Sequence, residues 1–432
     1  MLLLTAVTTA TVAKAQWEHR MTVDDLFQLV ESNSKTLLSE KISVEFAQKG
    51  IEAARAARLP ELTVSAAVSL NGDVLVTDRD LTHAQGFAAP RWGNSLALEA
   101  QQVVYAGGAV DAGIRMAQLQ ASRAGVSEQQ RRQQQRFLAL GQYLELYKLQ
   151  RREQVYEQNI LLTQRLIADV KARHQQGMAL RNDVTRYELQ METLRLGLRK
   201  LQDQRTILNY QLCNQLGLQE QTLIAPDSAS VFADLSPLAA HLSNWQNEAQ
   251  TSAASVLQAE LGEKMAREEV RLAKSEQLPK VAVVAADNFA GPFTYDIPPI
   301  DKNINYWYVG VGVKYPISSL FKQNKRVQQA RIRTRQAEQQ HAVAAEQLNN
   351  QVQEAWTYYQ QSFVELETQQ KSVQLARQNY EVVHERYLSQ LALITDMTDA
   401  QNVRLSAELN ESDARIGIAY AYYRLRYIAG TL

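Results

Sequence analysis

Apolar residues recur at helical spacing along two long stretches of the chain, residues 91–225 and 317–432. Neither stretch contains proline, which costs about 3 kcal/mol inside a helix. In the second stretch apolar residues recur every seven positions, at Val352, Tyr359, Leu366, Val373, Tyr380 and Tyr387. A seven-residue repeat is typical of helices packed as a left-handed coiled coil. The pattern predicts very long helices, including one over about 109–175 and one over about 180–216, with another helix over about 22–58.

Four shorter stretches alternate between apolar residues and small or polar residues. They are residues 62–70, 96–104, 281–285 and 307–315. An alternation of period two predicts strands with one apolar face, and a tilted strand of about ten residues can cross a bilayer. Aromatic residues lie at the ends of the fourth stretch, as at a membrane interface: Tyr306, Trp307, Tyr308 and Tyr315. A half-buried hairpin of a soluble protein would show the same alternation, so this pattern alone leaves both interpretations open.

The two halves of the chain repeat one order of elements. Leu59-Pro60 opens the first pair of predicted strands, and Leu278-Pro279 opens the second. Beyond the strands, matching residues lie 213 positions apart: Arg173 and Arg386, Asp183 and Asp396, Tyr210 and Tyr423, Leu212 and Leu425, Gly217 and Gly430. Each half is therefore predicted to contain a helix, two strands, a very long helix and a long helix.

The predicted boundaries follow from this repeat. The first repeat covers residues 16–217, a linker covers 218–247, and the second repeat covers 248–432. Residues 1–15 contain a short apolar run that ends in Ala-Lys-Ala, which resembles a secretory signal peptide with its cleavage site. An ordinary apolar N-terminus is the alternative, and the lack of basic residues before the run leaves open a start further upstream.

Composition narrows the possible functions. Lys and Arg together number 46, as do Asp and Glu, and a net charge of zero argues against a nucleic-acid binder. The single cysteine, Cys213, excludes an intramolecular disulfide framework and a Cys-based zinc site. The histidines are scattered, and neither a Ser–His–Asp set nor a pair of catalytic acids stands out. We therefore expect no enzyme, with no catalytic residue, no metal and no cofactor.

Four strands are too few to close a barrel by themselves. An open sheet edge in lipid would leave backbone N–H and C=O groups without partners, at a cost of several kcal/mol for each group. If the strands lie in a membrane, three copies that share one barrel would remove these edges. The connections 71–95 and 289–305 would then be the external loops, because their glycine, proline and aspartate residues suit exposure to solvent.

With these features the chain resembles the TolC-like outer-membrane efflux proteins over nearly all of its length. The resemblance rests on the duplicated order of elements, on Leu59-Pro60, on the exit Tyr105-Ala106-Gly107-Gly108 from the second strand, and on the pattern around Asp183 and Asp396. It implies a mainly α fold class with a small membrane β part. Long coiled-coil helices would form an α-barrel, and four strands from each chain would enter a trimeric twelve-stranded β-barrel.

The same resemblance implies a function and its partners. The homotrimer would lie in the outer membrane of a Gram-negative bacterium, in contact with outer-membrane lipid and with a large periplasmic portion. It would act as a passive conduit that docks with a periplasmic adaptor (membrane fusion protein) and an inner-membrane pump of RND or ABC type, and would export small molecules.

Three alternatives differ from this function in testable ways. A channel for type I protein secretion would use the same conduit for another cargo. A soluble periplasmic coiled-coil adaptor should show one hairpin flanked by β-rich domains, whereas this chain has two hairpin units. A soluble coiled-coil scaffold needs neither four alternating strands nor an export signal.

The resemblance also implies a periplasmic aperture at the tips of the helical hairpins. Asp396 and Asp399 match the family's pore-facing aspartates, and Asp183 occupies the equivalent position in the first half. Three copies would place a ring of three carboxylates at each position, which favours cations. Helix capping is the alternative role for these acids, because a first helical turn favours negative charge.

The resemblance implies a latch at the same tip, but this chain matches only part of the family's pattern for it. Tyr387 matches a tyrosine that helps to hold the family's closed tip. However, Ala392 stands where the basic partner is expected, and Gln390 replaces the turn glycine that Gly177 keeps in the first half. We therefore expect the aperture of this chain to be held by other pairs.

Overall fold

The structure is a computed structural model that describes residues 18–233, 235 and 241–432. The predicted signal peptide, residues 1–15, lies outside the described residues. The chain divides into two compact units. Unit 1 contains the described residues up to Lys41, Val126–Leu257 and Ala344–Leu432, and unit 2 contains Ile42–Gly125 and Gln258–Val343. The two longest helices, Ala109–Gln175 and Ser319–Leu388, contribute residues to both units.

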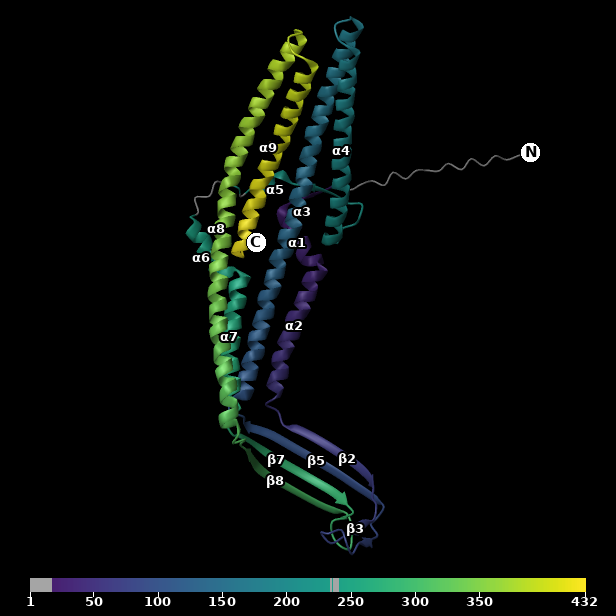
Figure 1. Cartoon of the computed structure of the whole chain (residues 1–432), viewed down its shortest axis with the longest axis vertical. Coiled ribbons are helices and arrows are strands. Elements are labelled where there is room, and N and C mark those ends of the chain that lie inside the picture. Colours follow the sequence, from purple (N-terminus) through teal and green to yellow (C-terminus); the bar gives the residue numbers. More distant parts are fainter. Residues whose placement is uncertain (1–17, 234, 236–240) are drawn as a thin grey trace, which may run out of the picture. The chain divides into compact units, whose positions relative to one another are not determined.

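Helices form most of the chain (Figure 1). They are α1 (Val23–Asn33), α2 (Lys35–Ala56), α3 (Ala109–Gln175), α4 (Arg181–Leu216), α5 (Ser228–Phe232), α6 (Leu242–Ser252), α7 (Ala254–Ser275), α8 (Ser319–Leu388) and α9 (Ile394–Ala429). The predicted long helices are thereby confirmed. Within the described residues, none of the helices combines the length and the apolar content that a helix needs to span a membrane.

The single helix predicted over about 22–58 is wrong, because the chain leaves the helical conformation at Ser34. This residue has φ −69° and ψ 113°, and its backbone N–H donates to the carbonyl of Val30 at the end of α1. Its hydroxyl accepts from the Leu37 N–H at 3.4 Å, so that one residue ends α1 and caps α2.

In the described part of the chain the strands form one four-stranded sheet and two small pairs. They are β1 (Glu18–Met21), β2 (Glu61–Leu70), β3 (Val74–Val76), β4 (Gln85–Phe87), β5 (Trp92–Tyr105), β6 (Leu223–Pro226), β7 (Lys280–Gly291) and β8 (Ile304–Lys314). The four-stranded sheet lies in unit 2, is antiparallel, and has the order β2-β5-β7-β8. The four predicted strands are these four, whereas the short strands β1, β3, β4 and β6 were not predicted.

The duplicated unit of the predicted fold class is confirmed by the matching lengths of the helices. Helices α1 and α6 have 11 residues each, α2 and α7 have 22 each, and α4 and α9 have 36 each. Helices α4 and α9 also end alike, at Gly217 with φ 67° and at Gly430 with φ 80°. The repeat boundaries stay a prediction, and α6 spans the predicted boundary between 247 and 248.

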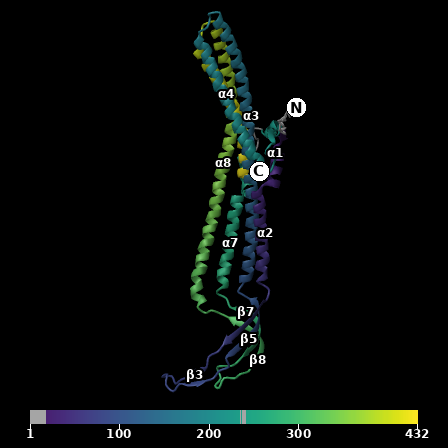
Figure 2. The ribbon, with the colours of Figure 1, turned by 90° about the vertical axis from the view of Figure 1, so that its right-hand side faces the viewer.

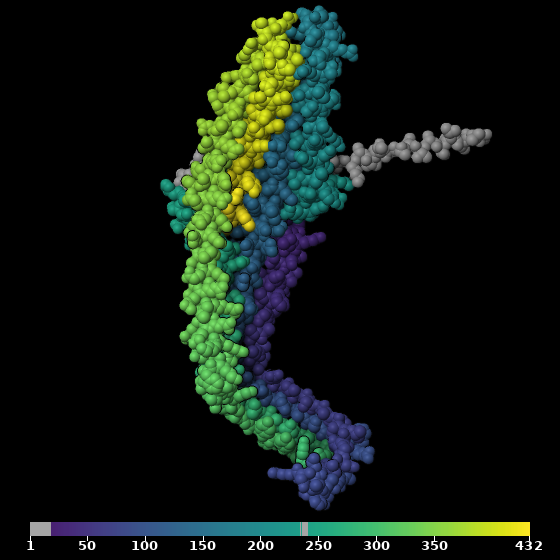
Figure 3. Space-filling view, in the orientation of Figure 1, coloured from purple at the N-terminus to yellow at the C-terminus, as the bar shows by residue number. Residues whose placement is uncertain are grey.

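In unit 1, two hairpins pack against each other. Helices α3 and α4 run side by side as the first hairpin (Figure 1, Figure 2), and Lys171 of α3 pairs with Glu188 of α4 at 2.8 Å. Helices α8 and α9 form the second hairpin, and Figure 3 shows α9 between α8 and α3. The heptad residues Val352 and Tyr359 of α8 are fully buried, so the predicted seven-residue repeat is a packing seam.

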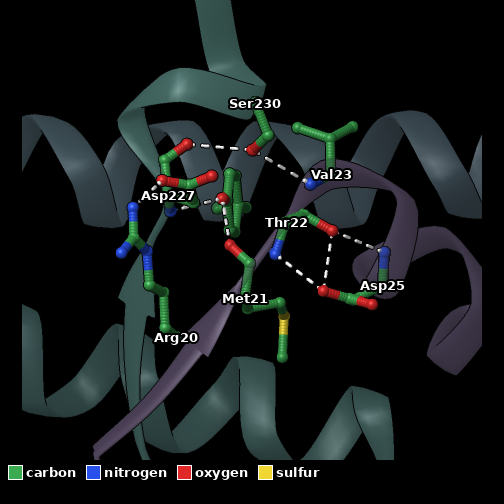
Figure 4. A network of polar contacts seen from close by, with 8 residues as sticks. Arg20, Met21, Thr22, Val23, Asp25, Asp227 and Ser230 are labelled. Carbon is green, nitrogen blue, oxygen red and sulfur yellow. Dashed lines mark hydrogen bonds and ion pairs between the residues drawn. The ribbon is translucent and has the colours of Figure 1, made fainter.

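A polar network fixes the strands β1 and β6 to α3 in unit 1 (Figure 4). The hydroxyl of Tyr143, fully buried in α3, donates to the Met21 carbonyl at 2.6 Å and accepts from the Asp227 N–H at 3.0 Å. Arg20 pairs with the Asp227 carboxylate at 2.7 Å. Burial raises the pKa of Tyr143 to about 12, so its hydroxyl stays protonated and able to donate.

Candidate functional site: hairpin tips and an apolar sheet face

The two hairpins turn at equivalent positions with the same backbone geometry. Gly177, in the turn between α3 and α4, has φ 75°, and Gln390, in the turn between α8 and α9, has φ 62°. Both values are in the left-handed region, which costs a residue with a side chain about 1–2 kcal/mol. Gln390 therefore occupies a glycine conformation, as the sequence comparison of the two halves indicated.

Exchanges at these turns should change stability in opposite directions. A Cβ added at Gly177 would have nothing within 4 Å, so Gly177→Ala carries only the backbone cost. We expect Gly177→Ala to lower the free energy of unfolding by about 1 kcal/mol. Gln390→Gly should raise it by only about 0.5 kcal/mol, because a glycine also increases the conformational entropy of the unfolded chain, which offsets part of the relieved strain. Thermal unfolding midpoints of the two variants would check this, and shifts of the same sign would contradict it.

The predicted aperture acids lie at the starts of α4 and α9. The Asp183 carboxylate accepts a hydrogen bond from the Leu180 N–H at 3.1 Å, and Asp396 accepts one from the Leu393 N–H at 2.9 Å. Each bond satisfies a backbone donor that the helix itself leaves unpaired. Asp399 lies one turn further along α9 and is exposed. Asp183 and Asp396 therefore cap the starts of their helices. Their position in a pore stays a prediction.

A cleft of about 430 Å³ lies between the two turns of unit 1. Asp183 and Tyr387 both line it, together with Arg173. Burial raises the pKa of the half-buried Tyr387, and the Asp183 carboxylate raises it further. Asp396 and Asp399 are not among the cleft residues. The structure therefore brings together two of the four predicted residues, one from each hairpin.

One contact in this cleft was not predicted. The Arg173 guanidinium, near the end of α3, donates to the Leu388 carbonyl at the end of α8 at 3.1 Å. That carbonyl has no partner within its own helix, and a cation there is favoured by the helix dipole. The contact joins the first hairpin to the second at their tips. The only sequence signal for it was the recurrence of arginine at 173 and 386.

A buried polar cluster deeper in unit 1 was also missed. Glu408 of α9 accepts hydrogen bonds from Arg377 at 3.1 Å, from Arg404 at 3.2 Å and from Asn159 at 3.3 Å. Its side chain is 9% exposed. The Arg404 guanidinium also lies 4.9 Å from the centre of the Tyr380 ring. Sequence periodicity could not find this cluster, because its members come from three helices.

In unit 2, the register of the sheet joins the apolar faces of all four strands. Val64 lies opposite Leu98, Ala285 opposite Val309, and Val283 opposite Val311. Directly paired residues share a face. The apolar members of this face are Leu62, Val64, Ala66, Val68, Leu70, Trp92, Leu96, Leu98, Ala100, Val281, Val283, Ala285, Phe289, Trp307, Val309, Val311 and Val313. Its polar members are Asn94, Gln102, Asp287 and Asn305. Large apolar side chains on both outer strands are strongly exposed, among them Val64 at 70% and Val311 at 69%.

The opposite face of the sheet is mainly small or polar, with Val284, Ile304, Tyr306 and Tyr308 among its larger members. Its members include Thr63, Ser65, Ser69, Ser95, Glu99, Gln101, Asn288, Gly310 and Gly312. A sheet that is apolar on one face and polar on the other fits between lipid and water. Among the described residues, β2 and β8 each pair with one strand only, so both sheet edges are open.

The predicted interfacial aromatics lie near the two ends of β8. Trp307 is 73% exposed near the start, and Tyr315, directly after the last strand residue, is 41% exposed. They are eight positions apart, about 26 Å along an extended strand. Tyr306 and Tyr308 flank Trp307 and point to the other face, because neighbouring strand residues alternate. On a strand tilted by about 40° this length spans roughly 20 Å of height, somewhat less than an apolar band about 25 Å tall, and membrane contact itself stays a prediction.

Comparisons with known proteins support the resemblance inferred from the sequence. Residues 245–431 match the model of the outer membrane efflux protein family. A comparison with curated protein sequences found no match. The family match and the solved structures below confirm the predicted resemblance to TolC-like outer-membrane efflux proteins.

Solved structures share the fold over nearly the whole chain. The outer membrane protein VceC from Vibrio cholerae is 15% identical with a TM-score of 0.75, and the match covers 94% of this chain and 96% of that one. A membrane protein from Pseudomonas aeruginosa is 16% identical with a TM-score of 0.78, over 96% and 91% of the two chains. The CmeC outer membrane channel from Campylobacter jejuni is 13% identical with a TM-score of 0.75, over 95% and 85%. The predicted fold class is therefore confirmed.

Proposed function

We propose that this chain, which resembles the outer-membrane efflux proteins in sequence over residues 245–431 and in fold throughout, is the outer-membrane channel of a tripartite export system. It is a homotrimer in the outer membrane of a Gram-negative bacterium. It docks with a periplasmic adaptor and an inner-membrane pump of RND or ABC type, and it lets small molecules pass without chemical change. The observation that carries the proposal is the four-stranded sheet with one mainly apolar face across all four strands and two open edges.

The open edges explain why one copy is insufficient. The edge strands β2 and β8 carry unpaired backbone groups along about ten residues each. In a bilayer each unpaired group would cost several kcal/mol. When β8 of one copy pairs with β2 of the next, three copies close a barrel of twelve strands and leave no edge. The apolar face then contacts lipid, and the small, polar face lines the water-filled interior.

Fractionation tests this proposal directly. The full chain, expressed with its own N-terminus, is expected in the outer-membrane fraction, where unheated samples run as a trimer on a mild detergent gel and heated samples run as a monomer. A soluble monomer in the periplasmic fraction would contradict the proposal. That result would favour the alternatives of a soluble adaptor or scaffold.

The acids at the start of α9 are expected to make the channel cation-selective. Three copies bring six carboxylates from Asp396 and Asp399 to the aperture, and such rings attract cations. In the double variant Asp396→Asn with Asp399→Asn, the amide oxygen at 396 can still accept from the Leu393 N–H, so the helix start is kept while the charge is lost. The reversal potential in a salt gradient across a planar bilayer should move toward zero.

The control for this measurement is Asp203→Asn, which removes an exposed acid far from the turn. Asp203 pairs with Arg199 in the interior of α4. Its loss should leave the selectivity unchanged. Equal selectivity in the double variant and the unmodified channel would show that these acids do not face the conducting path.

A further inference from the structure

The contacts between the two hairpins of one chain indicate how two copies meet. In unit 1, α9 packs on α3, whereas α8 and α4 lie at opposite edges of the helical layer (Figure 1). Helices α3 and α4 of the first repeat correspond to α8 and α9 of the second, with equivalent residues 213 positions apart. If repeats alternate around a closed ring, the α3–α9 contact within a chain recurs as an α8–α4 contact between copies.

The first contact is an ion pair within the chain, whose equivalent in the other repeat is found by moving each residue by 213 positions. Arg152 of α3 pairs with Asp413 of α9. The residues 213 positions away are Glu365 of α8 and Lys200 of α4. Both are exposed, and among the described residues neither has an ion-pair partner within the chain. Both charges are exchanged, so the transposed pair is again complementary.

The second contact within the chain is polar, whereas the residues at its equivalent positions are apolar. Gln190 of α4 donates to Asn402 of α9 at 2.7 Å. The equivalent positions hold Val403 of α9 and Leu189 of α4. Val403 is 47% exposed and Leu189 is 68% exposed. Both residues of the pair are apolar at the equivalent positions, so the two side chains would remain compatible if they packed against each other.

The third contact keeps its residue type. Arg173 donates to the Leu388 carbonyl at the tip, and the equivalent positions hold Arg386 in the last turn of α8 and Gln175, the last residue of α3. Arg386 is exposed. The correspondence does not extend to every contact, since the internal pair of Thr163 and Gln401 corresponds to Ala376 and Glu188.

We propose that the α8–α9 edge of one copy binds the α4 edge of the next through these transposed contacts. Glu365 pairs with Lys200 of the next copy, Val403 packs on Leu189 of the next copy, and Arg386 donates to the carbonyl of Gln175 at the neighbouring tip. The partner is a second copy of this chain, selected by complementary charge and by matched exposed apolar residues. The inference rests on the proposed trimer and names the residues that join its helices.

Cross-linking of introduced cysteines tests the packing of Val403 on Leu189. The native Cys213 is fully buried, so a short bismaleimide should react only with introduced thiols. In the full-length double variant Leu189→Cys with Val403→Cys, we expect covalent dimers and trimers on a denaturing gel. The matched control, Gln190→Cys with Asn402→Cys, joins two positions in contact within one chain and should give no ladder.

The outcomes separate the inference from the proposed function. An intact trimer on an unheated gel, without a ladder from the Leu189→Cys and Val403→Cys variant, would overturn the named interface and leave the channel function standing. The absence of any trimer in the unmodified protein would overturn both. A ladder equally strong in the internal control would also count against the named interface, because cross-linking would then not depend on position.

Charge exchange tests the pair of Glu365 and Lys200. Glu365→Lys and Lys200→Glu should each lower by a few degrees the temperature at which the trimer dissociates on a mild detergent gel, because like charges would face each other. The double variant restores opposite charges and should recover at least half of that loss. A double variant no more stable than the weaker single variant would overturn this pairing.

Discussion

Replacement of Val64 by arginine is expected to remove most of the heat-resistant trimer from the outer membrane. Val64 is 70% exposed on the apolar face of β2 and lies opposite Leu98 of β5. An arginine on the lipid face of a barrel costs about 2–4 kcal/mol near the middle of the bilayer, and the trimer would carry three. The intensity of the trimer band in unheated outer-membrane samples would measure the loss.

The adjacent residue supplies a matched control. Ser65 lies on the other face of the same strand, opposite Ala97. Arginine at 65 would point into the water-filled interior, so Ser65→Arg should leave the amount of trimer close to that of the unmodified protein. An equal loss in both variants would mean that the two faces of β2 do not differ in their surroundings, and the assignment of the apolar face to lipid would fail.

Loss of the Glu408 carboxylate is expected to destabilise unit 1 by about 3 kcal/mol, since it leaves buried donors without their acceptor. Arg404 and Asn159 both donate to this carboxylate, and the Arg404 side chain is only 23% exposed. The variant Glu408→Ala should therefore unfold at a midpoint temperature several degrees lower. The helical circular dichroism signal, recorded as the sample is heated, would measure this midpoint.

The control is Glu411→Ala, one turn further along α9. Glu411 pairs with Arg415 at 2.7 Å in an i, i+4 arrangement on the helix surface. Such pairs contribute about 0.3–0.5 kcal/mol, so this variant should unfold within about a degree of the unmodified protein. Similar midpoints for the two alanine variants would show that the Glu408 cluster contributes little to stability.

Most of the secondary structure could be predicted because its signals are local. The absence of proline over 91–225 and 317–432 and the seven-residue spacing around Val352 and Tyr359 both depend on neighbours along one helix. The four strands of the sheet showed their alternation in the same way. The break between α1 and α2 at Ser34 was not predicted, because a serine that caps a helix and a serine on a helix surface differ only in backbone geometry.

The candidate site was predicted less completely. Asp183, Tyr387, Asp396 and Asp399 were placed at the hairpin tips, where the structure has them, but their relation to one another was not. Asp183 and Tyr387 share a cleft that Asp396 does not line. The contact from Arg173 to the Leu388 carbonyl joins residues that are 215 positions apart, and no spacing along the chain indicates such a pair.

The sequence by itself determined the duplicated order of elements, the lengths of the long helices and the apolar face of each strand, because each of these follows from periodicity within a short segment. Only the tertiary structure decided that β5 pairs with β7 and so joins the two repeats in one sheet, and that Glu408 collects donors from α3, α8 and α9. These pairings depend on which distant surfaces are complementary, a property of packed elements that no single element carries.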